Sequence, residues 1–315
     1  MGRRDDEEER GAKILDLGLA RKLILGKSLE DEEDCVELYL HGMPPGDSTG
    51  WAAVDPFYTV MPGQLTIVTG WPSSGKSEWL DMLLVNLIKA GAWKFIIHSP
   101  ESRPRAWHLS RFVEKFSGKP FAEGPTERIT EFELRAWLRD MNVMFTFLRN
   151  KADDSMSLEE VMRGATMQLP EWGGSKVGLV IDPWNELDHF VPSGMTETQY
   201  ICAKLREIKN WAVQNQVHVW IVGHPRVTRR DDQGKLPVPR PDMISDSQHW
   251  WNKADNCVTV HRDQTQESER VEIHVQKVRA RHVGRIGVAT LLYDRTTGQY
   301  RDDVHTPFNV GRKSK

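Results

Sequence analysis

Residues 70–77 read GWPSSGKS, which matches the pattern G-x-x-x-x-G-K-[ST] at every fixed position. The run before it, 64–69, is rich in β-branched and apolar residues and predicts a strand. The run after it, 77–90, has apolar residues at helical spacing. A glycine-bounded loop between a strand and a helix is the setting in which this pattern binds phosphate groups. The sequence therefore predicts a phosphate-binding loop, and a plain glycine–serine turn is the weaker interpretation.

The residue types of this loop match what a nucleoside triphosphate requires. Backbone N–H groups and the helix N-terminus direct partial positive charge at the phosphates. We expect Lys76 to reach the β- and γ-phosphates and the Ser77 hydroxyl to coordinate Mg²⁺. ATP and Mg²⁺ are therefore the expected cofactors, and the expected nucleotide-binding residues are Gly70, Pro72, Ser73, Ser74, Gly75, Lys76 and Ser77.

Composition excludes several classes of protein. The 315 residues carry a formal net charge of -3, which argues against a generally basic, DNA-coating surface, although a ring can confine its basic residues to a central channel. No apolar run approaches the ~18 residues that span a bilayer, so we expect no membrane partner. The three cysteines are scattered and predict neither a disulfide framework nor a metal knuckle. Most of the twelve tryptophans lie in apolar runs, which favours core or subunit contacts over base stacking.

The start of the chain is charged and lacks the apolar core of a targeting signal. We expect a cytoplasmic protein, in a bacterial cell or a phage-infected one. Apolar residues at helical spacing within 13–42 predict linker helices, which either dock on this chain or pack on a neighbouring subunit. The Pro- and Gly-rich stretch 43–50 marks a boundary. The predicted domains are therefore a charged segment with linker helices over 1–48, the main domain over 49–302, and a tail over 303–315.

Strand-like and helix-like runs alternate from residue 51 onward, which predicts an α/β fold with a mostly parallel sheet covered by helices on both faces. After residue 255 the pattern changes to strands and predicts an antiparallel extension. Strands are expected at 64–69, 93–98, 143–147, 177–182, 217–222, 257–260, 271–277 and 285–293, and helices at 77–90, 104–117, 157–168 and 196–214.

Ligands of open α/β sheets bind at the carboxyl ends of the strands, so residues that end each strand are candidate catalytic groups. Asp182 follows a buried apolar run and is expected to hold Mg²⁺, although it could instead cap the turn before a proline. Glu101 ends the strand that we expect beside the phosphate-loop strand, and it is the candidate base for the attacking water. Glu186 is the alternative base. His224 ends a third strand and is the candidate sensor of the γ-phosphate, or a plain polar strand-end residue.

Two further basic segments are candidate interaction sites. The loop 226–245 is long for a compact domain, and loops of that length are often functional. It is expected to contact DNA, unless it is only a solvated surface loop, and a second loop, 188–196, could face the same channel. Alternation on a strand places Lys277, Arg279 and Arg281 on one face, where they could reach a triphosphate on a neighbouring subunit, DNA phosphates or only solvent. The candidate DNA-binding residues are Arg226, Arg229, Arg230, Lys235 and Arg240.

The ordered blocks GWPSSGKS, HSPES, VIDPWNELDH, VHVWIVGHPR, NKADNCVTVHRD and VQKVRARHVGR resemble the ATPase domain of DnaB-like, RecA-fold replicative helicases, most closely the Twinkle-like subgroup, over about residues 50–300. The resemblance implies a RecA-like core and a ring, usually a hexamer, that translocates 5′ to 3′ on single-stranded DNA. It implies nucleotide and Mg²⁺ binding by Lys76 and Ser77, metal binding by Asp182, base catalysis by Glu101, a sensor role for His224, and a pair acting in trans formed by Lys277 and Arg279.

The chain departs from the pattern at 244–250, where Asp246 and Gln248 replace small residues next to the expected DNA-facing loop. Nothing in the sequence corresponds to a primase-like domain, so a primase or polymerase is expected, if at all, on a separate chain. Two alternatives stay open: a RecA-like recombination or strand-annealing ATPase, and an ATP-binding assembly factor without unwinding activity.

Overall fold

The computed structural model describes residues 31–91, 93–149, 155–226, 236–244, 247–263 and 268–303. The chain divides into two compact units, Met1–Pro44 and Pro45–Lys315. The described part of the first unit is helix α2, Glu32–His41, which carries three acidic residues in its first turn and a histidine in its last. That distribution complements the helix dipole. The predicted boundary at 48/49 stays a prediction, and residues 45–48 group with the second unit, where Asp47 bridges to Val60.

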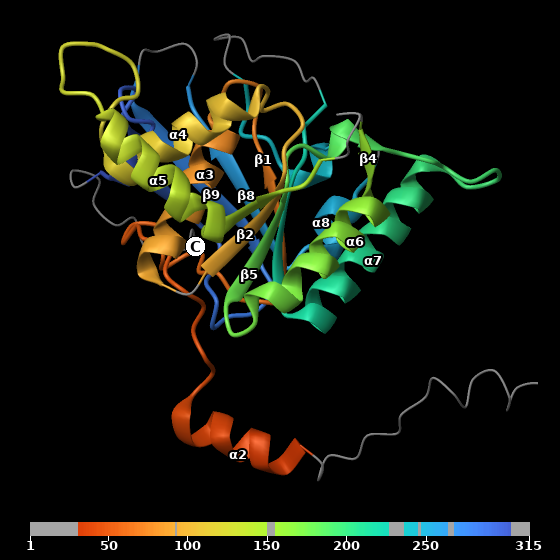
Figure 1. Ribbon diagram of the computed structural model, residues 1–315. Helices are drawn as coiled ribbons and strands as arrows, with labels where there is room; N and C mark the ends of the chain where they lie inside the picture. Colours follow the sequence, from red (N-terminus) through yellow and green to blue (C-terminus); the bar gives the residue numbers. More distant parts are fainter. Residues whose placement is uncertain are drawn as a thin grey trace, which may run out of the picture. The chain divides into compact units, whose positions relative to one another are not determined.

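The second unit is built around one nine-stranded sheet (Figure 1). The order of the strands is β11-β10-β9-β8-β1-β7-β5-β2-β3. All neighbours from β8 to β3 are parallel, whereas β9, β10 and β11 pair antiparallel. The bounds are β1 Leu65–Thr69, β2 Trp93–His98, β3 Phe145–Phe147, β5 Lys176–Ile181, β7 Val217–Val222, β8 Asn256–His261, β9 Arg270–Val278, β10 Gly287–Tyr293 and β11 Tyr300–Asp302. The predicted α/β sheet with an antiparallel extension is confirmed, with the antiparallel part beginning one strand later than the change of pattern.

Helices cover both faces of this sheet, and each face has its own apolar core. Figure 1 shows α3, α4 and α5 on one face and α6, α7 and α8 on the other. β1, β2, β5 and β7 are buried along almost their whole length, as parallel strands between two helical layers must be. Nine of the twelve tryptophans are buried, which agrees with a packing role for most of them. The bounds are α3 Lys76–Ala90, α4 Arg105–Ser117, α5 Glu131–Met144, α6 Leu158–Gln168, α7 Glu197–Asn215 and α8 His249–Lys253.

A second, two-stranded sheet pairs β4, Met156–Ser157, with β6, Leu187–Asp188. Capping explains where several helices start. Ser157, Thr130 and Thr196 each accept a hydrogen bond from the backbone N–H three residues later, while the Glu or Gln at that position accepts one from the cap backbone. These boxes begin α6, α5 and α7. The four helices predicted in the main domain are present within a residue or two, whereas α5 and the short α8 were not predicted.

One prediction about the sheet is wrong. The strand that leads to Glu101, β2, does not lie next to β1, because β7 and β5 lie between them. The order of strands along the chain does not fix their order in the sheet, because a crossover connection can pass over one or more strands. The carboxyl ends of β1, β7, β5 and β2 nevertheless share one edge, because these strands are parallel.

No helix among the described residues combines the length and the apolar character that crossing a bilayer requires.

Candidate functional site

The loop between β1 and α3 wraps around the side chain of Lys76. Its ammonium group is buried and donates to the carbonyls of Gly70, at 2.9 Å, and Trp71, at 3.1 Å. Gly70 cannot be replaced by a larger residue, because a Cβ there would lie 2.3 Å from the carbonyl oxygen of Val260. Gly75 adopts a φ of +91°, which disfavours any side chain. The loop is therefore held in one shape by its glycines and by the lysine inside it.

Two neighbours hold the outside of this loop. Tyr300 donates from its hydroxyl to the carbonyl of Gly75 at 3.2 Å, and the indole N–H of Trp71 donates to the carbonyl of Pro237 at 2.7 Å. Ser74 presents a buried hydroxyl that has no hydrogen-bond partner among the described residues. An orphaned hydroxyl inside a loop of this shape fits a phosphate oxygen as its partner.

Asp182 directly follows β5 and lies against the start of α3. Its carboxylate accepts a hydrogen bond from the Ser77 hydroxyl, and it interacts electrostatically with Lys76. Burial raises the pKa of Asp182 to about 6, and the nearby carboxylates of Asp81 and Glu101 add to the rise. A buried carboxylate that is short of positive charge fits a divalent cation.

The donor set suits Mg²⁺ better than a metal held by protein alone. Within the described ranges, no three His, Cys, Asp or Glu side chains form a cluster that could hold a metal. Mg²⁺ in phosphoryl-transfer sites keeps several waters and takes only one or two protein oxygens beside the substrate phosphates. Ser77 and Asp182 supply one hydroxyl and one carboxylate, which matches that pattern.

Glu101 and His224 face each other across the same edge of the sheet. The Nε2 atom of His224 lies 4.0 Å from Oε1 of Glu101. Partial burial, followed by the charge of Glu186, raises the pKa of Glu101, whereas Lys76 lowers it. Burial lowers the pKa of His224, and the charge of Lys76 lowers it further. The structure therefore brings together Lys76, Ser77, Asp182, Glu101 and His224, and Glu186 lies close enough to act on Glu101 electrostatically.

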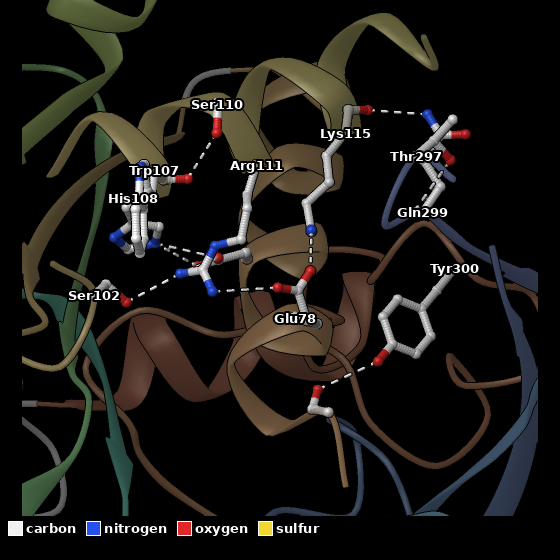
Figure 2. A network of polar contacts seen from close by, with 12 residues as sticks. Glu78, Ser102, Trp107, His108, Ser110, Arg111, Lys115, Thr297, Gln299 and Tyr300 are labelled. Carbon is white, nitrogen blue, oxygen red and sulfur yellow. Dashed lines mark hydrogen bonds and ion pairs between the residues drawn. The ribbon is translucent and has the colours of Figure 1, made fainter. Parts of the chain in front are cut away.

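A polar network ties the loop of Glu101 to the phosphate-loop helix (Figure 2). Arg111 of α4 donates to the Ser102 hydroxyl at 3.0 Å and to Glu78 of α3 at 3.3 Å. Ser102 also accepts from Ser99 at 2.9 Å, so the residues on both sides of Glu101 are fixed.

A second layer of the network lies behind these contacts. His108 of α4 contacts both carboxylate oxygens of Asp81 at 3.1 Å, and Arg111 reaches the same carboxylate at 3.8 Å. Lys115 of α4, fully buried, pairs with Glu78. Sequence reasoning missed Glu78, Asp81, His108 and Arg111. Their signal was charge at helical spacing on α3 and α4, which resembles an ordinary solvated face until the two helices are packed together.

The predicted row of cations near the end of the chain is only partly correct. β9 ends at Val278, so Lys277 lies on the strand, while Arg279 and Arg281 lie in the turn after it. Arg279 also has a partner within the chain, because its Nε lies 3.1 Å from the buried carboxylate of Asp255. Lys277 donates to the carbonyl of Trp251 at 2.5 Å. The expectation of one strand face is therefore wrong: the strand turns once its pairing with β8 ends.

The basic loop 226–245 is described only at its two ends. A bridge between Pro225 and Ile244 brings these ends together, and the N–H of Arg226 donates to the carbonyl of Met243 at 2.8 Å. Arg240 pairs with Asp242 at 3.2 Å and lies 5.0 Å from the ring of Trp251.

The rest of the prediction on this loop cannot be placed. Arg229, Arg230 and Lys235 lie outside the described residues, as does Asp246. Gln248, with Arg226 and Asp242, lines a cavity of about 410 Å³. In the second predicted loop, 188–196, Phe190 is strongly exposed.

Comparison with known structures gives the class of the fold. The chain matches the solved ATPase domain of another protein with a TM-score of 0.70 at 18% identity, covering 86% of this chain and 98% of that one. It matches a DnaB-like replicative helicase, solved to show its interactions with primase, with a TM-score of 0.71 at 16% identity, covering 91% and 70%. The RadB recombinase is more distant, with a TM-score of 0.51 at 12% identity, covering 81% and 98%. The fold is therefore a RecA-type ATPase core like that of DnaB-like helicases.

Comparison of the sequence gives one curated relative. The chain is 39% identical over 298 residues to the Twinkle homologue of Arabidopsis thaliana, a chloroplastic and mitochondrial protein. No model of a protein family matches the sequence. The alignment covers 91% of this chain but 41% of that relative, so the chain spans less than half the length of the curated protein it matches. The chain is therefore similar in sequence to a Twinkle homologue and similar in fold to DnaB-like helicases.

Proposed function

We propose that the chain is the motor domain of an ATP-dependent replicative DNA helicase. One observation carries the proposal: Lys76, Ser77, Asp182, Glu101 and His224 meet at one edge of the sheet, in a fold of the DnaB type and a sequence of the Twinkle type. ATP with Mg²⁺ is the proposed cofactor.

The residues divide the chemistry among them. Lys76 neutralises charge on the β- and γ-phosphates from inside the loop, and Ser77 with Asp182 holds Mg²⁺. Mg²⁺, when bound, offsets charge that develops on the transferred phosphoryl group. Glu101, with a raised pKa, accepts a proton from the attacking water. His224, 4.0 Å from Glu101, senses the γ-phosphate by donating to it and passes its loss to the loop that begins at Arg226.

We further propose that the chain forms a ring, in the family pattern a hexamer, that moves 5′ to 3′ on single-stranded DNA. The loop 226–245, through Arg226, Arg229, Arg230, Lys235 and Arg240, and the loop 188–196 would contact the strand. Lys277 and Arg279 would serve the nucleotide of a neighbouring subunit. A primase or polymerase would act from a separate chain. The cytoplasmic location expected from the sequence stays a prediction, since the curated relative is named as an organellar protein.

The test is ATP hydrolysis by the purified chain with and without single-stranded DNA, together with its mass in solution. The proposal requires hydrolysis that DNA stimulates, by a particle of several subunits. Turnover at background with and without DNA would instead favour an assembly factor without motor activity.

The fold also resembles that of a recombinase, although less closely. A filament-forming, strand-annealing ATPase would likewise hydrolyse ATP on DNA. Annealing of complementary strands without unwinding of a forked duplex would favour that alternative.

A further inference from the structure

The side chain of Trp71 attaches the phosphate loop to the basic loop 226–245. Trp71 occupies the first variable position of the pattern at 70–77, and it is buried. Its indole N–H donates to the carbonyl of Pro237 at 2.7 Å. Pro237 belongs to residues 236–240, here called the limb, which lie at the described C-terminal end of the basic loop. A single side-chain hydrogen bond thus joins two loops that are far apart in sequence.

The limb is stiff and has a second attachment. It reads LPVPR, so its two prolines have a fixed φ and the residue before each proline is restricted to extended conformations. The carbonyl of Pro239 accepts hydrogen bonds from Thr259 of β8 and Gln276 of β9, both at 3.0 Å. A stiff segment that is fixed at Pro239 and held at Pro237 follows a displacement of Trp71 instead of absorbing it.

The backbone of Trp71 is tied to Lys76. The carbonyl of Trp71 accepts from the Lys76 ammonium group at 3.1 Å and from the N–H of Ser74 at 3.1 Å. Phosphates that bind in the loop would compete for the ammonium group, and the carbonyl would lose its charged donor. Hydrogen bonds from an ionised donor are among the strong ones, so their loss changes the balance of forces on the peptide. Trp71 therefore contacts Lys76 through its backbone and the limb through its side chain.

We propose that Trp71 is a positioning residue that couples nucleotide binding at the phosphate loop to the position of the limb. Nucleotide draws Lys76 away from the Trp71 carbonyl, and the indole carries the resulting shift to Pro237. Arg240, at the end of the limb, lies 5.0 Å from the ring of Trp251 and is one of the candidate DNA-binding residues. The coupling rests on the nucleotide binding of the proposed function, and its consequence for DNA rests on the DNA contacts proposed there.

Hydrogen exchange over 236–244, followed by mass spectrometry, measures the limb directly. The wild-type chain and Trp71→Phe are compared without nucleotide and with a saturating non-hydrolysable ATP analogue and Mg²⁺, the saturation being set from a calorimetric titration of each chain. We expect the analogue to change the exchange rate of this segment at least about threefold in the wild type, within the range that one hydrogen bond can supply. Trp71→Phe keeps an aromatic ring and loses the N–H, so it should abolish the change.

Two further variants separate this coupling from a general loosening of the fold. Trp211→Phe removes an indole N–H that donates to the Thr166 hydroxyl at 3.0 Å, between α7 and α6, and it should keep the wild-type response. Thr259→Val removes one of the two donors at Pro239 and leaves the phosphate loop intact, and it should reduce the response. Persistence of the full response in Trp71→Phe, or its equal loss in Trp211→Phe, overturns the proposal.

The same experiment distinguishes failure of this inference from failure of the proposed function. A wild-type chain that does not bind the analogue contradicts both. A wild-type chain that binds the analogue with no change over 236–244 contradicts the coupling alone. Titration with a single-stranded oligonucleotide extends the test, since coupling between two ligands is reciprocal. The analogue should change the affinity for the oligonucleotide at least about threefold more in the wild type than in Trp71→Phe, and an equal change in both chains contradicts the role of Trp71.

Discussion

The ammonium group of Lys76 is buried and donates to two carbonyls of its own loop. Burial lowers its pKa, and the charges of Asp182 and Glu101 partly offset that effect. The lysine is thus held ready for an anion that replaces the loop carbonyls as its partner.

Lys76→Ala should reduce ATP turnover by at least about 100-fold, because a preorganised cation at the transferred phosphate is lost. Steady-state hydrolysis measures it, with far-ultraviolet circular dichroism to show that the fold is retained. Arg135→Ala is the matched control, a cation lost from an exposed helix face. Near-normal turnover by Lys76→Ala would refute the site.

The burial of His218 predicts that the domain loses stability at acidic pH. It is fully buried in β7, donates from Nδ1 to the carbonyl of Met61 at 2.6 Å, and contacts the Thr66 hydroxyl at 2.9 Å. Burial lowers its pKa to about 4, well below the usual 6.5. As the pH falls, the unfolded chain takes up the proton before the folded chain does. The stability that neutral His218 contributes is therefore complete above pH 6.5 and is lost as the pH falls toward 4.

Lowering the pH from 7 to 5 should reduce the free energy of unfolding by about 2 kcal/mol through this histidine alone. Urea denaturation at the two pH values measures the loss, and His218→Gln should remove about that much of the difference, whatever its effect at pH 7. An unchanged pH dependence in His218→Gln would show that other groups cause the acid sensitivity.

At the residue scale, the sequence indicated which side chains lie together where the signal was local, and the roles given to them stay predictions. The loop 70–77 and the acids that follow β2 and β5 lie next to apolar runs, and the parallel sheet collects such positions at one edge. Arg279 failed as a free cation because its partner, Asp255, is 24 positions away in sequence and meets it only when the turn after β9 folds back.

At the scale of elements, α3 and α4 act together through Arg111. This side chain joins Ser102, next to Glu101, to Glu78, one residue after Ser77 (Figure 2). One guanidinium therefore connects the neighbours of the proposed base, Glu101, and of the proposed metal ligand, Ser77.

Arg111→Ala should lower the turnover of ATP by about 10- to 100-fold with a much smaller change in KM, since displacing a catalytic group costs rate more than binding. Arg111→Lys should recover part of it, because a single ammonium can meet only one of the two partners. Steady-state kinetics compares both with Arg135→Ala as control. A change confined to KM would show that Arg111 does not position the base.

The elements themselves were mostly predictable. α5 begins with a capping box of Thr130 and Glu133, so a start signal was present. Leu134, Trp137, Leu138 and Met141 follow at helical spacing, so this helix could have been predicted from the sequence and was missed. The separation of β2 from β1 by two intervening strands could not be predicted, because it depends on the path of the crossovers and on no local pattern.

At the scale of the whole molecule, a variant of Arg279 tests whether the chain works as the proposed ring or as a monomer. Within one chain it pairs with Asp255, which Lys209 also neutralises at 2.5 Å. Arg279→Ala therefore leaves a buried acid with a remaining partner, and the fold should survive.

If Arg279 serves a neighbouring nucleotide, Arg279→Ala should bind ATP normally and lose turnover by about 1000-fold, as for a cation supplied in trans. Mixing it with Lys76→Ala should restore part of the activity, because some interfaces then combine an intact loop with an intact arginine. Arg135→Ala, which breaks an exposed ion pair outside the proposed sites, is the control. No rescue in the mixture would assign Arg279 to its own chain alone.

The central claim is tested most directly by unwinding of a forked DNA duplex with a 5′ single-stranded tail, by the purified chain with ATP and Mg²⁺. The account predicts strand separation that requires the 5′ tail and is abolished in Lys76→Ala. DNA-stimulated hydrolysis without strand separation, or separation that proceeds equally from a 3′ tail, would contradict it.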